Sequence, residues 1–245
     1  MTIDSNFLKA RDHIDQAERY LKINSANQAI KFLDRAQELL SLYQNNNWYN
    51  YTILLKIKSL ILNQSYDIAL NYCKSLEASY FLVKDYRNLC ILLMEWSNIL
   101  NDTKQFTKAK LKLLQAKSLL SHKQNKDLAP QVYALLGYHF GLVQDNRQSL
   151  IYYQKASAKI DNKTATWCFY ANNLASAYES IYFLDQALNL YQKALSLSIE
   201  LKLGDLSTNL MEAISRCYLK LGDQQNQRAW EQKMLKMNQL KINQL

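Results

Sequence analysis

The chain has 245 residues with only four glycines and one proline, and it carries a formal net charge of +9. Strand-rich folds and phosphate-binding loops need glycine in their turns, so this composition argues against β and α/β architectures and favours helices joined by short polar loops. The sequence has no run of about 18 apolar residues, so we expect no membrane span. The N-terminus lacks the apolar segment of a secretory signal, and the four cysteines stand far apart, which favours a reduced, cytoplasmic setting.

Three columns of mostly small residues recur in register along the chain. They are Ala17, Ile57, Ser97, Gly137, Ala175 and Ser215; Ala29, Ala69, Ala109, Ser149, Ala187 and Gln227; and Ala36, Leu76, Ala116, Ala156, Ala194 and Met234. In each column the successive steps are 40, 40, 40, 38 and 40 residues. A small side chain facing a large one lets two helices approach closely, so we predict six helical hairpins. Their expected ranges are residues 6–44, 48–82, 86–120, 130–160, 164–203 and 206–240.

The hairpins differ in how closely they follow the pattern. The second departs from it, because Ile57 and Leu76 replace small residues. The fourth is expected to begin just after Pro130, which the first turn of a helix tolerates. The sixth follows Gly204, interpreted as a helix-stop glycine, and Asp205, interpreted as a capping residue.

Residues 224–245 are expected to form a polar, amphipathic closing helix. Its apolar side would carry Trp230, Met234, Met237 and Leu240. The last unit of a solenoid has no following neighbour, so the helix is interpreted as a cap over the end of the core. The alternative is that it packs on a partner or on a second copy of the chain, which would give a homodimer.

The segment from residue 167 to 203 carries the repeat pattern most clearly. Its small and aromatic positions are Ala175, Tyr178, Ala187, Tyr191 and Ala194. The segment resembles the tetratricopeptide repeat (TPR), in a longer form with a period near 40 instead of 34. That branch includes kinesin light chains, bacterial peptide-sensing regulators and the sensor domain of maltose-activator-type transcription factors. The resemblance extends over nearly the whole chain.

The resemblance implies an all-α fold, a right-handed α-α superhelix of about six hairpins forming a single TPR-like solenoid over residues 1–245. In this architecture the first helix of each hairpin lines a concave surface. The related regulators carry a DNA-reading or ATPase module in addition, and we find neither here. The family therefore implies a fold more strongly than a function.

Candidate partner-binding residues lie at the expected concave positions of the first helices. Asparagine and glutamine side chains donate and accept together, which suits the backbone of an extended peptide, and aromatic rings offer flat apolar area. The resemblance implies that an asparagine at Asn172 or Asn173 holds peptide backbone, and the sequence leaves open which of the two faces the groove. The candidates are Tyr51, Lys58, Asn98, Asn101, Gln131, Tyr138, Phe169, Asn172, Asn173, Glu179, Asn209 and Arg216.

Positive charge is concentrated in the middle of the chain. Residues 101–165 contain 11 Lys and Arg against 4 Asp and Glu. Lys104, Lys108 and Lys112 follow at four-residue spacing and are predicted to form one stripe on the outer helix of the third hairpin, which Lys110 and Lys117 widen. This basic patch, extending to Lys126, is either a solvated outer face or a docking surface for an acidic partner. Nucleic-acid binding is disfavoured because aromatic residues for base stacking do not interleave with the lysines.

Catalytic motifs are missing from the sequence. The three histidines have no metal-ligand spacing, and there is neither a glycine-rich phosphate loop nor a G-x-S-x-G nucleophile motif. We therefore expect no enzyme activity, no metal site and no cofactor. The preferred hypothesis is an adaptor or scaffold that binds a peptide or protein segment in its concave groove. A ligand-sensing module for a signalling peptide or small effector is the alternative, and binding of an acidic partner or nucleic acid through the basic patch is a minor one.

Overall fold

The computed structural model describes residues 5–41 and 47–242, and within these ranges the chain forms helices and turns without strands. The all-α prediction is confirmed. The helices are α1 (Ser5–Lys22), α2 (Ala26–Leu39), α3 (Asn47–Leu62), α4 (Tyr66–Leu82), α5 (Tyr86–Asp102), α6 (Phe106–Ser118), α7 (Ala129–Leu142), α8 (Asn146–Ser157), α9 (Ala165–Ser180), α10 (Leu184–Glu200), α11 (Gly204–Leu221) and α12 (Gln224–Ile242), with 3₁₀ turns η2 (Leu119–Ser121) and η3 (Lys123–Leu128) after α6.

The helices divide between two compact units, unit 1 (residues 1–126) and unit 2 (residues 127–245). Within the described residues each unit contains three helical hairpins, and each hairpin lies close to one of the six ranges predicted from the repeat columns. The end of the first range at Gln44, and residues 243–245 of the closing helix, lie outside the described residues. A single solenoid over the whole chain stays a prediction.

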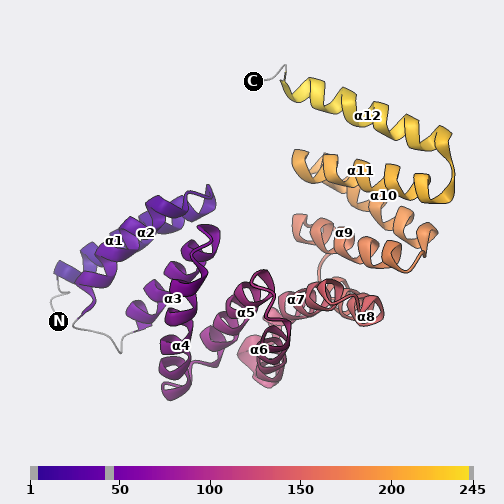
Figure 1. The fold of residues 1–245 in the computed structure, drawn as a ribbon. Helices are drawn as coiled ribbons and strands as arrows, with labels where there is room; N and C mark the ends of the chain where they lie inside the picture. Colours follow the sequence, from indigo (N-terminus) through magenta and orange to yellow (C-terminus); the bar gives the residue numbers. More distant parts are fainter. Residues whose placement is uncertain (1–4, 42–46, 243–245) are drawn as a thin grey trace. The chain divides into compact units, whose positions relative to one another are not determined.

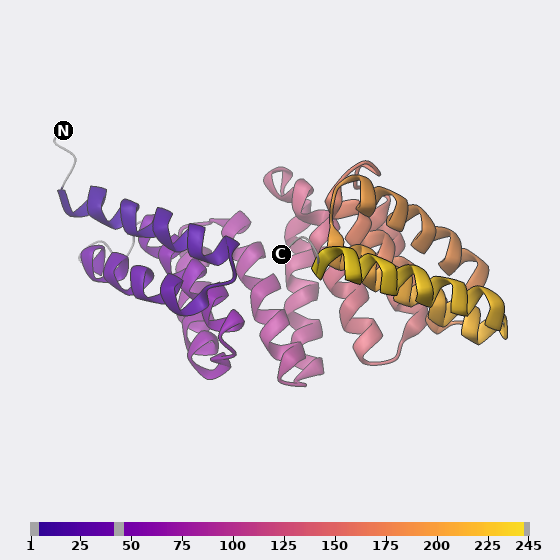
Figure 2. The ribbon, with the colours of Figure 1, turned by 90° about the horizontal axis from the view of Figure 1, so that it is seen from above.

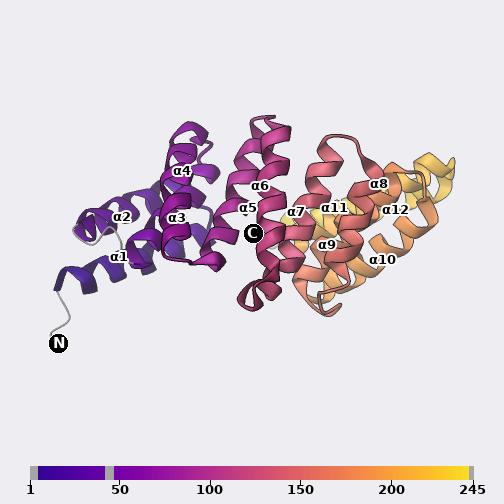
Figure 3. The same cartoon turned by 90° about the horizontal axis from the view of Figure 1, so that it is seen from below.

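Within each unit the first helices of successive hairpins form one layer. In unit 1, α1 contacts α3 and α3 contacts α5, while α5 and α6 lie side by side as one hairpin (Figures 1 and 3). In unit 2, α7 contacts α9 and α9 contacts α11, and each second helix packs beside its own first helix (Figure 2). The exposed side of the first-helix layer is therefore a continuous surface within each unit.

The small-residue columns lie where helices meet. From the first hairpin to the fifth, every residue of the three columns is buried. Gly137 shows why size matters there, because a Cβ atom at this position would stand only 2.9 Å from the ring of Tyr153 on α8. The partly buried Gln227 and Met234 end the columns in α12. The repeat pattern thus marks the buried positions at which the helices contact each other.

A left-handed backbone conformation also repeats along the chain, in register with the three columns of small residues. The turn inside each hairpin contains one residue with positive φ, between 55° and 77°. These residues are Asn24, Gln64, Lys104, Gln144, Tyr182 and Gly222. They repeat with the same steps as the small residues, although five of the six are not glycine and adopt a left-handed conformation that L-residues disfavour. The geometry of the turn is the same from hairpin to hairpin while its sequence is not.

Two helix-boundary predictions are wrong. Gly204 is the first residue of α11, so it does not terminate the preceding helix, and the left-handed residue at that junction is Lys202. Lys104 lies in the turn before α6, which begins at Phe106, so the predicted lysine stripe does not run along a single helix. Pro130 does lie in the first turn of α7, as expected.

A lysine packs on an aromatic ring at both hairpin junctions of unit 1. At the first junction the lysine is on the first helix of its hairpin and the ring on the second helix, and at the second junction this order is reversed. At the first junction Lys56 on α3 lies 4.9 Å from the ring centre of Tyr72 on α4 and pairs with Asp34 on α2 at 2.6 Å. At the second junction the aromatic residue is on α5 and the lysine on α6. Lys112 lies 3.8 Å from the ring centre of Trp96, which stands 40 residues after Lys56.

Lys112 also pairs with Glu77 on α4 at 2.7 Å, so each junction joins three helices through one buried or half-buried lysine. The two lysines occupy different repeat positions, because Lys112 stands 40 residues after Tyr72.

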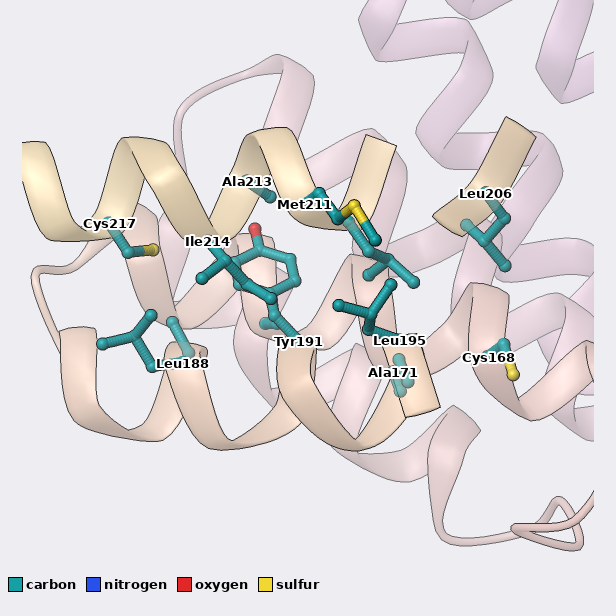
Figure 4. Packing of buried hydrophobic residues seen from close by; sticks show 14 of the residues in the cluster. Cys168, Ala171, Leu188, Tyr191, Leu195, Leu206, Met211, Ala213, Ile214 and Cys217 are labelled. Carbon is teal, nitrogen blue, oxygen red and sulfur yellow. The ribbon is translucent and has the colours of Figure 1, made fainter. Parts of the chain in front are cut away.

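Helix α12 covers the end of the unit 2 core. Trp230, Met234 and Met237 on its apolar side pack against a cluster built from α9, α10 and α11. Figure 4 shows the centre of that cluster, where Tyr191 lies beside Ile214. The side chain of Leu240, the fourth predicted apolar residue, lies outside the described residues. A cap accounts for these contacts, and dimerisation through α12 stays a prediction.

Candidate binding surface

In unit 1 three of the predicted binding residues are engaged with glutamates of the same first-helix layer. The Tyr51 hydroxyl donates to Glu18 at 2.6 Å, and burial together with this bond raises the pKa of Tyr51 to about 12. Lys58 pairs with Glu95 at 3.7 Å, and the Asn98 amide points to the same carboxylate at 3.5 Å. Because these groups satisfy each other across α1, α3 and α5, they stabilise the layer and are poorly placed to bind a partner.

Two predicted residues are buried. Asn101 is 3 % exposed and Glu179 is 4 % exposed, so neither side chain lies on a solvent-facing surface. Both were expected on the groove side because their helix positions fit the register. The Glu179 side chain turns instead towards α11, where it meets Arg216 and Lys220. A partner could reach neither Asn101 nor Glu179 without moving the surrounding helices.

In unit 2 the predicted residues gather on the exposed side of α7, α9 and α11. We call this surface the amide face. Its members are Gln131 and Tyr138 on α7, Phe169, Asn172 and Asn173 on α9, and Asn209 and Arg216 on α11. Gln131, Phe169 and Asn209 share one repeat position and are all exposed, so they form a row across the three helices. Tyr138 and Arg216 share a second repeat position, seven residues further along their helices.

The amides of this face remain available. Within the part of the chain that the structure describes, the side chains of Asn172, Asn173 and Asn209 form no hydrogen bond. The two aromatic residues beside them are open to solvent, Tyr138 at 43 % and Phe169 at 50 % exposure. Gln131 differs, because its amide nitrogen can donate to the carbonyl oxygens of the preceding turn at 3.2 Å. Amides and rings together match the needs of an extended peptide.

The two adjacent asparagines are not equivalent. Both are half-buried, so neither is excluded from the surface. Asn172 shares its repeat position with the exposed Glu212 on α11, whereas Asn173 shares its position with the buried Ala213. The register therefore favours Asn172 as the asparagine on the exposed side of the first-helix layer.

A buried carboxylate fixes the edge of the amide face. Glu179 accepts hydrogen bonds from Arg216 Nε at 2.8 Å and Nη2 at 2.9 Å, from Lys220 Nζ at 2.8 Å and from the Tyr191 hydroxyl at 3.0 Å. Burial alone would raise the pKa of Glu179, but the bonds from Arg216 and Lys220 outweigh it and lower the pKa to about 2. The carboxylate thus ties α9 to α10 and α11 and holds Arg216 in place.

Sequence reasoning missed Lys220 and the buried role of Tyr191. A signal for them exists, because Arg216 and Lys220 are four residues apart on one helix face, and a lone glutamate on the preceding first helix needs a cation if buried. Burial of that glutamate was the part that could not be read from the pattern.

The lysines of the basic patch divide into exposed and engaged groups. Lys108 is exposed and donates to Gln105 at 2.9 Å, and Lys110 is exposed on the same helix. Lys117 is half-buried. Lys112 is held between Glu77 and Trp96, so its charge is largely neutralised within unit 1. The patch is therefore narrower than the spacing of its lysines indicated.

Two properties concern the whole described chain. No described helix combines the length and the apolar character that crossing a bilayer requires. Among residues 5–41 and 47–242, no three His, Cys, Asp or Glu side chains are grouped so that they could hold a metal ion.

No family model matches the sequence, and no curated protein matches it either. Solved structures do match the fold. BtubC (BKLC) from P. vanneervenii has a TM-score of 0.70 at 14 % identity, over 97 % of this chain and 92 % of that one. The apo form of RapI has a TM-score of 0.72 at 16 % identity, over 99 % of this chain and 66 % of that one.

A signal transduction ATPase with a tetratricopeptide repeat sensor from Pyrococcus horikoshii has a TM-score of 0.77 at 14 % identity. The match covers 97 % of this chain and 37 % of that protein, so this chain spans little more than a third of its length. At these identities the matches establish the architecture alone. The chain has the all-α, TPR-like helical-repeat fold.

Proposed function

We propose that the chain is a non-catalytic interaction module that binds an extended peptide or protein segment across the amide face of unit 2. The observation that carries the proposal is the set of amides on α9 and α11 without hydrogen bonds in the described part of the chain, beside the exposed rings of Tyr138 and Phe169. An unpaired amide gains a partner when peptide backbone arrives, and an aromatic residue gains apolar contact at low entropic cost.

Unit 1 is less suited to this role, because its corresponding groups already pair across α1, α3 and α5. The ion cluster around Glu179 supports the proposal in a second way. It fixes the neighbouring helices before a ligand binds, which lowers the entropy lost on binding.

The proposal is tested by peptide selection on the immobilised full chain, using a phage-displayed library of random twelve-residue peptides. Enriched peptides are synthesised, labelled and titrated by fluorescence anisotropy against the parent and against a variant with alanine at Tyr138, Asn172 and Asn173. The matched control carries alanine at Asn189 and Gln192, which are exposed on the second helix α10.

We expect the triple variant to weaken at least one class of peptide by about thirtyfold or more, because the amide pair of at least one asparagine and the Tyr138 ring contribute about 1 kcal/mol each. The control variant should bind as the parent does. Equal binding by parent and triple variant for every enriched peptide would remove the amide face as the binding surface.

A second candidate function, sensing of a small effector, is favoured by two adjoining cavities of about 250 Å³ and 510 Å³ in unit 1. Both are lined by Tyr49 and Tyr72, and the buried Lys56 lines the larger one. This candidate predicts that a metabolite panel contains a compound that raises the melting temperature of the parent. The rise should be lost when Tyr49 is changed to alanine. A panel without such a compound would leave peptide binding as the better account.

A further inference from the structure

The outer side of unit 1 carries an apolar run that the fold does not need. Phe81, Leu82 and Val83 follow each other at the end of α4 and are 65 %, 79 % and 48 % exposed. Consecutive exposed apolar residues cost solubility unless they serve a function. The repeat position of Phe81 is occupied by the exposed serines Ser41 and Ser121 in the neighbouring hairpins, so the hairpin architecture does not require a ring there.

Phe81 forms one wall of a cavity of about 410 Å³ between α4 and α6. Leu89 and Leu93 of α5 form its floor, and Leu119 of η2 forms the opposite wall. The leucines of the floor are buried and Phe81 is open, so the floor and these two walls are apolar. Lys74, Glu77, Gln115 and Ser118 also line the cavity, and the charge of Glu77 is paired with Lys112. The volume of the cavity is large enough to admit a bulky apolar side chain.

A second cavity of about 670 Å³ is formed by the residues that follow Phe81 and Leu119 in the sequence. It is lined by Lys84, Tyr86, His122, Lys123 and Gln124. Lys84 follows Phe81 by three residues, and His122 follows Leu119 by three, so the apolar and the basic cavity are neighbours on both sides. Its lining contains two lysines and no acidic residue.

The basic cavity is well organised. The rings of Tyr86 and His122 stack with their centres 4.3 Å apart. Arg87 donates to the Gln124 carbonyl oxygen at 2.6 Å, and the buried Asn125 amide donates to the carbonyl oxygen of Tyr86 at 3.1 Å. These contacts hold the segment after α6 against α5. The walls of the cavity are therefore set before any partner arrives.

The two lysines of the basic cavity are not neutralised by acidic side chains among the described residues of unit 1. Among the residues that the structure describes, Lys84 and Lys123 form no ion pair. They belong to the part of unit 1 where the excess of positive charge is greatest, because residues 101–126 hold seven lysines against one aspartate. A partner segment that brings carboxylates would gain charge-assisted contacts here.

We propose that the outer side of α4, α6 and the 3₁₀ turns is a second docking surface, which binds an acidic peptide segment of a partner protein. A bulky apolar side chain of that segment enters the cavity beside Phe81, and neighbouring carboxylates contact Lys84 and Lys123. The lysines favour a segment with carboxylates, and the neighbouring apolar cavity favours one that also carries a bulky apolar residue. The surface is separate from the amide face of unit 2, so either can exist without the other.

The test uses the same displayed peptide library on the full chain, followed by anisotropy titrations of the enriched peptides. Two variants probe the surface, Phe81→Ser for the apolar cavity and the pair Lys84→Glu with Lys123→Glu for the basic one. The matched control is Ile199→Ser, because Ile199 is a half-exposed apolar residue at the repeat position of Phe81 on α10. All four positions are exposed, so the urea midpoint of each variant should equal that of the parent.

We expect a class of enriched peptides that combines acidic residues with a bulky apolar residue. Its affinity should fall about tenfold or more in each of the two variants, fall with added salt, and stay unchanged in the Ile199→Ser control. This class should also bind the amide-face triple variant as tightly as the parent, which separates the two surfaces.

Three results would overturn the proposal. The first is enrichment of no acidic peptide class, and the second is an acidic class that binds the Phe81→Ser and lysine variants as tightly as the parent. The third is a competing occupant. A fluorescent twenty-nucleotide oligothymidylate that binds regardless of Phe81→Ser would assign the lysines to nucleic acid, and a dimer that Phe81→Ser abolishes in sedimentation would assign the cavity to a second copy.

Discussion

Changing Glu179 to glutamine should destabilise unit 2 without affecting unit 1. The substitution keeps the size of the side chain. It removes the negative charge of the carboxylate, which accepts hydrogen bonds from Arg216, Lys220 and Tyr191. Glutamine retains one acceptor oxygen, so part of the hydrogen bonding survives. What is lost is the charge that holds two cations of α11 against α9.

The expected loss follows from the pKa. Glu179 titrates at about 2 in the folded chain, and an unfolded glutamate titrates at about 4.3, which at about 1.4 kcal/mol per unit corresponds to roughly 3 kcal/mol. The side chains of Arg216 and Lys220 are 46 % and 33 % exposed, so water compensates part of the loss, and we expect about 2 kcal/mol. Because the folded pKa is the lower one, this contribution is complete above about pH 4.5 and disappears as the pH falls towards 2.

Urea unfolding of parent and variant, followed by far-UV circular dichroism at several pH values between 7 and 2.5, measures the difference. Hydrogen exchange with mass spectrometry locates it, and amides of α9–α11 should exchange faster while those of α1–α6 stay unchanged. Glu212→Gln is the matched control, because Glu212 is an exposed glutamate on α11. The reasoning is refuted if Glu179→Gln costs less than about 0.5 kcal/mol at pH 7, or if its cost grows as the pH is lowered.

Three further predictions concern packing, turns and thiols. Gly137→Ala should cost about 1–3 kcal/mol in urea unfolding, because its Cβ would stand 2.9 Å from a ring, whereas Gly141→Ala in the same helix, with its nearest neighbour at 3.4 Å, should be neutral or stabilising. Lys104→Gly should stabilise unit 1 and Gly222→Ala should destabilise unit 2, each by about 1 kcal/mol, because both positions have positive φ; a common sign for the two changes would contradict this. Ellman's reagent should leave all four thiols unmodified in the folded chain, since all are buried and burial raises the pKa of Cys73 to about 12; rapid labelling without denaturant would refute it.

The fold was predictable because its information is local and repeated. Small residues such as Ala29 and Ala69 mark helix contacts, and their common step is enough to delimit the hairpins. The turns were less predictable, because residues as different as Gln64 and Tyr182 adopt the same left-handed geometry. In these turns the packing of the two helices determines the left-handed backbone conformation, and no particular residue type indicates it in the sequence.

The exposure of the candidate side chains was predictable in one unit, whereas their availability was not predictable in the other. On α9, Phe169 and Asn172 lie on the exposed side as their register indicated. On α3, Lys58 also has the expected register, but its charge is paired with Glu95 from the next hairpin. Register places a side chain on a face, whereas its availability depends on a contact with a residue of another repeat, which a repeat pattern does not encode. The same reason hid the burial of Glu179.

The exchanged lysine and aromatic positions in unit 1 give each hairpin a distinct neighbour. Hairpins built on one pattern have similar surfaces, so a hairpin could stack on the wrong member of the series during folding. If the second hairpin were skipped, Asp34 would face Trp96 where it now meets Lys56, and Lys112 would face an uncharged glutamine where it now meets Glu77. Both ion pairs would be lost at once. The exchanged positions therefore favour the observed order of the three hairpins over an arrangement that skips the second.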